Sequence, residues 1–122
     1  MIAGVGVDVV DLARFERAVG RTPQLRTRLF TDAELSADGR ERSLRSLAGR
    51  FAAKEALMKA LGDATGIRWH DMEVVADGEG NPSLVLRGAA EARAGAIGVT
   101  DLHLSMSHDA GIAIAYVVAE RP

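Results

Sequence analysis

Residues 49–62 have the sequence GRFAAKEALMKALG, which predicts a helix that carries charges among apolar and small residues. The helical spacing runs from about Arg40 to Leu61, and Gly62 is typical of the left-handed residue that ends a helix. At about 100° per residue, one arc of this helix is apolar and should face the core. The arc contains Leu44, Leu47, Phe51, Met58 and Leu61. Lys54 falls inside the same arc, so the sequence puts a charge on the face predicted to be buried.

The charged flank of this helix is lined by small residues. Glu55 lies at the edge of the apolar arc, and Lys59 lies one turn beyond it, on the same side as Ala48 and Ala52. Small side chains beside a carboxylate let a ligand or another backbone come close, whereas a solvated face usually carries long polar residues. A Glu followed by a Lys four residues later is also a common surface pair, worth about 0.3–0.5 kcal/mol. The helix alone is therefore compatible with a functional site and with a structural pair.

The N-terminal residues 2–10 alternate and are rich in β-branched side chains, which predicts a strand. Its valines should point to one face, while Asp8 shares the other face with Gly4 and Gly6. Glycine in a strand often marks the close approach of a ligand or another chain. A carboxylate in an otherwise apolar strand is costly unless it is paired or bound to a metal. Asp8 is therefore a candidate cation ligand.

The rest of the chain mixes short helices and strands. Asp11 is predicted to cap a helix that runs to about Val19, and Thr31 with Glu34 forms the capping-box pattern of another short helix. Further elements are expected as a helical piece from Pro23, strands at 69–76 and 83–86, a helix at 88–97, and a hairpin of 102–107 with 112–119. Because no regular βαβ alternation appears, we predict an α+β domain with a mainly antiparallel sheet packed against one long helix.

Composition limits the class of protein. The chain has 122 residues, of which 48% are hydrophobic and only 4% aromatic, so a single domain over residues 1–122 with an aliphatic core is expected. It contains no cysteine, which excludes disulfides and thiolate metal sites. The N-terminus lacks the pattern of a signal peptide, and no apolar run reaches the about 18 residues of a membrane span. We therefore expect a cytoplasmic protein with no membrane role, and the net charge of −2 argues against nucleic-acid binding.

A basic patch follows the first strand. It contains Arg14, Arg17, Arg21, Arg26 and Arg28, opposed only by Glu16. Such a run is most often a solvated helix face, and the alternative is a dock for an acidic helix of a partner protein.

Asp8 and Glu55 together suit a hard ion such as Mg²⁺, which takes one or two carboxylates and completes its shell with water and phosphate. A phosphate-bearing substrate follows from that chemistry. Lys54, Lys59 and Arg50 stand within about a turn of Glu55 and could hold the remaining phosphate charges. The residues therefore point to phosphoryl transfer.

Three stretches give the sequence a specific resemblance. They are GVGVDVVDLARFER, RFAAKEALMKALG and SMSHDAGIAIA, accompanied by LFTDAE. In this order and spacing they resemble the holo-acyl-carrier-protein synthases, the small homotrimeric phosphopantetheinyl transferases, over nearly the whole chain. The resemblance implies the fold of that family and transfer of 4′-phosphopantetheine from coenzyme A to a serine of apo acyl carrier protein. Adenosine 3′,5′-bisphosphate would be the second product.

The resemblance also implies roles for individual residues. Asp8 and Glu55 match the family's Mg²⁺ ligands, and Lys59 matches a lysine that contacts the diphosphate of coenzyme A, so these three are the catalytic candidates. Arg50 and His108 match positions near the 3′-phosphate.

Two further residues of the long helix, Lys54 and Gly62, are assigned to the coenzyme A site as well. Arg14 matches an arginine that meets the acidic helix of the carrier protein, and we assign Arg21 and Arg26 to the same surface.

Other points stay open at the level of sequence. Where family members often have KALGTG, this chain has KALGDATG, which changes the loop near the diphosphate. The proton of the acceptor serine could pass to Glu55 directly, or to a water held by the metal or by Asp8. Two rival interpretations are a Mg²⁺-dependent hydrolase of a nucleoside diphosphate compound and a non-catalytic trimeric ligand-binding protein. Because the chain carries each motif once, we also expect a homotrimer with its sites between subunits, His108 of one chain meeting Asp8 and Glu55 of the next.

Overall fold

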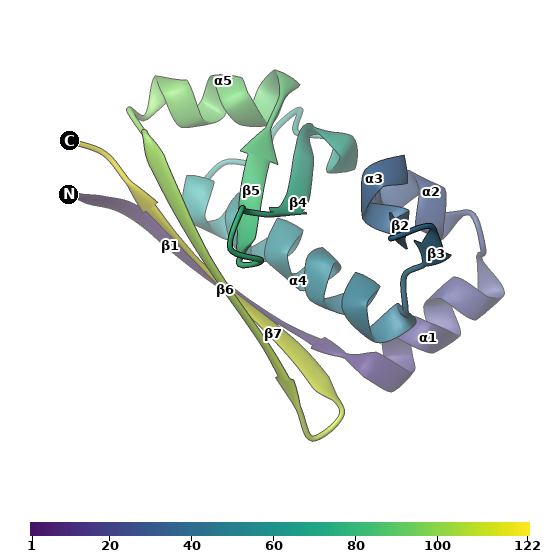
Figure 1. The fold of residues 1–122 in the computed structure, drawn as a ribbon. Coiled ribbons are helices and arrows are strands. Elements are labelled where there is room, and N and C mark those ends of the chain that lie inside the picture. The colour runs from purple at the N-terminus through teal and green to yellow at the C-terminus, as the bar shows by residue number, and fades with distance from the viewer.

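The computed structural model describes residues 1–122, and its largest sheet is antiparallel with the strand order β1-β7-β6. The strands are β1 (Ile2–Asp11), β6 (Asp101–Asp109) and β7 (Ile112–Glu120). The two ends of the chain lie side by side at one end of this sheet (Figure 1). There the terminal amine of Met1 donates to the carbonyl of Arg121 at 2.7 Å, and the amide of Arg121 donates back to Met1 at 2.8 Å. Within the sheet, β7 is the central strand, because it pairs with β1 on one edge and with β6 on the other.

The long helix α4 (Leu44–Leu61) crosses one face of the sheet (Figure 1). It lies so close to β1 that a Cβ atom at Gly6 would be 1.8 Å from the carbonyl oxygen of Ala56, and one at Gly4 would be 1.8 Å from that of Ala60. The glycines of β1 therefore make room for a helix of the same chain. The prediction that they admit a ligand or another chain is wrong at these two positions.

A buried ion pair joins α4 to the helices around it. The ammonium of Lys54 is fully buried and lies 2.6 Å from the carboxylate of Glu34. It also donates to the carbonyl oxygens of Leu29 at 2.7 Å and Trp69 at 3.2 Å. Glu34 in turn accepts from the amides of Thr31 and Val74, each at 3.0 Å. This network ties α2 (Leu25–Leu29), α3 (Asp32–Leu35) and β4 (Met72–Ala76) to α4.

The predicted start of the long helix is wrong. Residues 36–41 instead form a small hairpin of β2 (Ser36–Ala37) and β3 (Arg40–Glu41). Its turn is Asp38-Gly39, with φ of 53° and 75°, and an Asp-Gly pair is typical of such turns. Helix α4 begins after Ser43, whose hydroxyl accepts from the amide of Ser46 at 3.2 Å.

The remaining elements agree with the predicted α+β class. They are α1 (Leu12–Arg21), the short 3₁₀ helix η1 (Trp69–Asp71), β5 (Pro82–Leu86) and α5 (Gly88–Ala96). Asp11 caps α1 by accepting from the amide of Arg14 at 2.9 Å, and Thr31 with Glu34 forms the predicted capping box. Most bounds differ from the predicted ones by one or two residues, and the strand expected at 69–76 begins later, because Trp69–Asp71 coil into η1. No helix has the length and apolar character needed to cross a bilayer.

The sheet has one covered and one uncovered face. On β7, the residues that face α4 are buried and mostly small, namely Ala113, Ala115, Val117 and Ala119. The opposite side, here called the outer sheet face, has no helix on it (Figure 1). It exposes Val5, Val7, Val9 and Tyr116 at 46%, 39%, 54% and 48%. An apolar surface of this kind is typical of a contact with another chain.

The contact between α4 and β1 gives a stability prediction. We expect Gly6→Ala to lower the free energy of unfolding by about 1–3 kcal/mol or more, because the new methyl group would overlap the backbone of Ala56. Gly20→Ala is the matched control, since nothing lies within 4 Å of that position and alanine favours a helix. Urea unfolding of both variants measures the difference, and equal stability of the two would contradict the contact.

Candidate active site

The first group of site residues lies where β1 meets the C-terminal half of α4. Asp8 is on the side of β1 that faces α4, two residues after Gly6. Its carboxylate is 3.2 Å from the ammonium of Lys59, which also donates to the carbonyl of Val7 at 2.9 Å. Lys59 therefore bridges the helix to β1, and no ion pair forms between it and Glu55 along the helix. The Glu55–Lys59 surface pair, which the sequence of the helix allowed, therefore does not form.

Glu55 completes this group. Burial raises the pKa of its carboxyl, the nearby carboxylate of Asp8 raises it further, and Lys59 lowers it. Two carboxylates that repel one another, with one half-exposed lysine beside Asp8, are a candidate site for an added cation. The structure thus brings Asp8, Glu55 and Lys59 together, which the sequence could only suggest.

A cavity of about 600 Å³ opens beside these two carboxylates and is called here the carboxylate cavity. Its wall is largely apolar and includes Phe15, Phe51 and Trp69. The ring of Phe51 packs at a tilt against the other two, with centroid distances of 5.8 Å to Phe15 and 5.5 Å to Trp69. Arg14 and Arg28 also line it. The sequence places Arg28 in the basic patch without a link to the site, and it gives no role to Trp69. The turn that forms η1 is what brings Trp69 to this wall.

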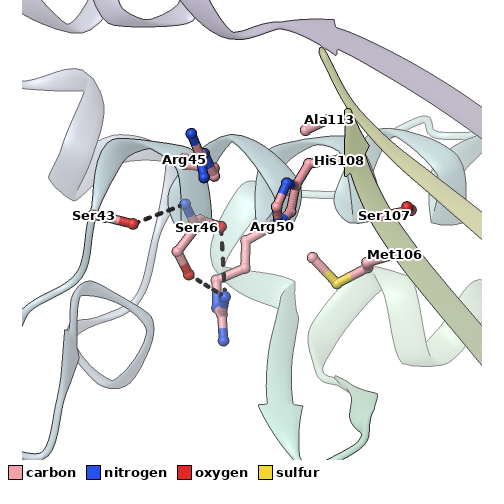
Figure 2. A pocket seen from close by; sticks show the side chains of 9 residues that line it. Ser43, Arg45, Ser46, Arg50, Met106, Ser107, His108 and Ala113 are labelled. Atoms are coloured by element: carbon pink, nitrogen blue, oxygen red, sulfur yellow. Dashed lines mark hydrogen bonds between the residues drawn. The ribbon is translucent and has the colours of Figure 1, made fainter. Parts of the chain in front are cut away.

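A second cavity, of about 330 Å³, lies between the first turns of α4 and the end of β6 (Figure 2). Arg45, Arg50 and His108 line it, and none of its lining residues is acidic. We call it the arginine–histidine cavity. Burial lowers the pKa of Arg50 to about 10, with repulsion by Arg42 adding to the effect and Glu34 opposing it. The Nε atom of Arg50 is buried without a partner. These features favour an anionic group in this cavity.

Within one chain the two cavities are separate. No residue lines both of them. Arg50 and Glu55 stand five positions apart on α4, which turns their side chains about 140° away from one another. His108 lies in strand β6 and not in the turn, because the hairpin turns only at Ala110 and Gly111, with φ of 50° and 77°.

The structure places two predicted site residues elsewhere. All three donors of the Lys54 ammonium are taken by Glu34, Leu29 and Trp69 inside the protein. A role for Lys54 in binding coenzyme A does not agree with this position, which sequence spacing could not show because the partners come from distant segments. Gly62 ends α4 with φ of 81°, and its amide donates back to carbonyls of that helix. Its N–H is therefore not free for a ligand.

The structure also places the loop that follows α4 and two arginines of the basic patch. Asp63 folds the loop after α4 by accepting from the amide of Thr65 at 2.9 Å. Hydrogen bonding by the side chain of Thr65, and then by its amide, lowers the pKa of Asp63. Arg21 ends α1 and is exposed. Arg26 lies 2.9 Å from Glu41 of β3, so its charge is partly compensated within the chain.

Comparison with known proteins identifies the family to which this arrangement belongs. The family model of the 4′-phosphopantetheinyl transferase superfamily matches residues 4–117. The chain belongs to this superfamily. Phosphopantetheinyl transferases are enzymes, and the resemblance that the sequence motifs predicted is confirmed together with the enzyme class.

Individual phosphopantetheinyl transferases match over nearly their whole length. The holo-acyl-carrier-protein synthase of Leifsonia xyli is 61% identical over 121 residues, which covers 99% of this chain and 98% of the relative. The crystal structure of the synthase from Neisseria meningitidis has 34% identity and a TM-score of 0.84, with 99% and 100% of the two chains covered. The Helicobacter pylori synthase, solved in complex with coenzyme A, has 32% identity and a TM-score of 0.79, covering 95% and 99%.

Proposed function

We propose that this phosphopantetheinyl transferase moves 4′-phosphopantetheine from coenzyme A to a serine of apo acyl carrier protein and releases adenosine 3′,5′-bisphosphate. The observation that carries the proposal is the group of Asp8, Glu55 and Lys59 beside the carboxylate cavity. The names of the relatives support the same transfer, and the Helicobacter pylori synthase was solved with coenzyme A.

Asp8 and Glu55 would hold Mg²⁺. The repulsion between their carboxylates fits a divalent cation, and a site with two carboxylates leaves room for the water and phosphate ligands that Mg²⁺ prefers. When bound, the ion neutralises negative charge on the diphosphate of coenzyme A. Lys59, whose side chain is 55% exposed, is placed to add a positive charge on the same side.

In the transfer, the serine oxygen of the carrier protein forms a bond to the phosphorus next to pantetheine. The bond from that phosphorus to the oxygen of adenosine 3′,5′-bisphosphate breaks, and the serine proton leaves to a base. Lys59 would stabilise charge that develops on the leaving oxygen. Glu55 is the candidate base within the chain, and a water held at Asp8 is the alternative.

The arginine–histidine cavity would take the 3′-phosphate of coenzyme A. Its arginines and His108 offer donors without a competing carboxylate. Because this cavity and the carboxylate cavity lie apart in one chain, a single coenzyme A is most simply bound between two chains. The uncovered apolar outer sheet face supplies a surface for the assembly, and we propose a closed homotrimer with three shared sites.

The carrier protein would dock along α1. Arg14 lies at the carboxylate cavity and Arg21 is exposed at the other end of the helix, which suits an acidic helix laid across both. We keep Arg26 in this surface, although its ion pair with Glu41 partly compensates its charge. This basic and partly apolar surface favours a protein acceptor over water, so the hydrolase interpretation has less support.

The metal assignment can be tested with near-isosteric variants. We expect Asp8→Asn and Glu55→Gln each to reduce the rate of carrier protein modification by on the order of 100-fold or more, because each removes an anionic ligand. Turnover measured over a Mg²⁺ titration, with circular dichroism as the folding control, checks this. Full turnover by either variant at saturating Mg²⁺ would refute the assignment.

The docking surface predicts a selective effect of charge reversal. Arg14→Glu should raise the KM for the carrier protein by about tenfold or more while the KM for coenzyme A changes little, since like charges would then face one another. Added salt should weaken the wild-type interaction with the carrier protein. Equal losses toward both substrates would point instead to damage at the metal site.

The shared site predicts complementation between two inactive variants. Glu55→Gln and His108→Ala proteins, mixed under conditions that allow subunit exchange, should regain activity. At equal mixing about a quarter of the interfaces would pair an intact Glu55 with an intact His108. A site built within one chain would show no recovery in the same assay.

A further inference from the structure

Ser46 forms an unusual contact at the edge of the arginine–histidine cavity. Its hydroxyl oxygen accepts hydrogen bonds from two guanidinium groups, from Arg50 Nη1 at 2.7 Å and from Arg42 Nη1 at 3.3 Å. Figure 2 shows the guanidinium of Arg50 lying beside Ser46 along the helix. Two cations thus share one neutral acceptor.

The position of this hydroxyl is fixed from several sides. The side chain of Arg42 is anchored because its Nε donates to the carbonyl of Glu34 at 2.8 Å and its Nη2 approaches the carbonyl of Ser36 at 3.5 Å. The backbone of Ser46 lies in the first turn of α4, held by the cap at Ser43. Ser46 therefore offers Arg50 a hydrogen-bond acceptor whose position is fixed by the protein.

The side chain of Arg50 forms hydrogen bonds with Ser46 alone. Its Nη1 meets only the hydroxyl and the carbonyl oxygen of Ser46, the second at 3.5 Å, and its Nε is buried without a partner. A free arginine side chain loses much rotamer freedom when it binds an anion, whereas one held beforehand loses less. The hydroxyl of Ser46 is the group that restricts Arg50 before any ligand arrives.

We propose that Ser46 is a positioning residue, which holds the guanidinium of Arg50 for the 3′-phosphate of coenzyme A. The inference rests on the proposed function, and it concerns a residue that would act through Arg50 and would not need to touch the substrate. It predicts an effect confined to ligands that carry the 3′-phosphate.

The test compares coenzyme A with 3′-dephospho-coenzyme A by calorimetric titration. We expect the wild-type protein to prefer coenzyme A, and Ser46→Ala to weaken coenzyme A binding by on the order of tenfold while binding of the dephospho compound stays the same. Ser46→Thr keeps the hydroxyl and should retain the preference. Ser83→Ala, which removes a hydroxyl from β5 away from this cavity, should leave both affinities unchanged.

Ser46→Ala is expected to fold as the wild type does, so a change in affinity reports on the lost hydroxyl. Alanine favours a helix, and the cap from Ser43 reaches the backbone amide of Ser46, which the substitution leaves in place. Ser46→Cys, close in size but a poor acceptor, is a second variant that should show the same selective loss. An unchanged preference for coenzyme A in both variants, or an equal loss toward both ligands, overturns the role of Ser46 alone. A wild-type protein with no preference overturns this role together with the phosphate site proposed at Arg50.

Discussion

The backbone contact between α4 and β1 is the constraint on which the rest of the molecule depends. Gly4 and Gly6 let the helix lie directly on the strand, with Ala56 and Ala60 as the facing residues. Any side chain at these glycines would push the two elements apart. Because Asp8 follows on the same side of β1, this contact also sets its separation from Lys59 and from the carboxylate of Glu55. The same close packing therefore builds the core and the candidate catalytic group.

The buried pair of Lys54 and Glu34 has a complementary role. It holds the carbonyls of Leu29 and Trp69, two residues that line the carboxylate cavity, against the middle of α4. Removal of one partner of such a pair typically costs about 3–5 kcal/mol, because the other charge stays buried. Next to it in the sequence, Glu55 turns to the cavity, so neighbouring charges on one helix serve structure and chemistry separately.

Much of this architecture could be predicted from local patterns. Alternation identified β1, and caps at Asp11 and Thr31 identified two helices, because these signals depend on near neighbours. The hairpin around Asp38 is not predicted, because the helical spacing in the sequence starts at about Arg40, which lies in the second strand of that hairpin. The partners of Lys54 could not be predicted, since Leu29, Glu34 and Trp69 come from segments distant in the sequence. The motifs located Asp8, Glu55 and His108, yet only the three-dimensional arrangement separates them into two cavities.

The pairing of Met1 with Arg121 has a practical meaning for protein engineering. Both ends of the chain leave the sheet together, at the end away from the β6–β7 turn and α1 (Figure 1). A short linker could join them, and new ends could then be opened in an exposed loop such as that at Asp77–Gly80. Affinity tags and fluorescent fusions attached at either end would likewise sit far from α1.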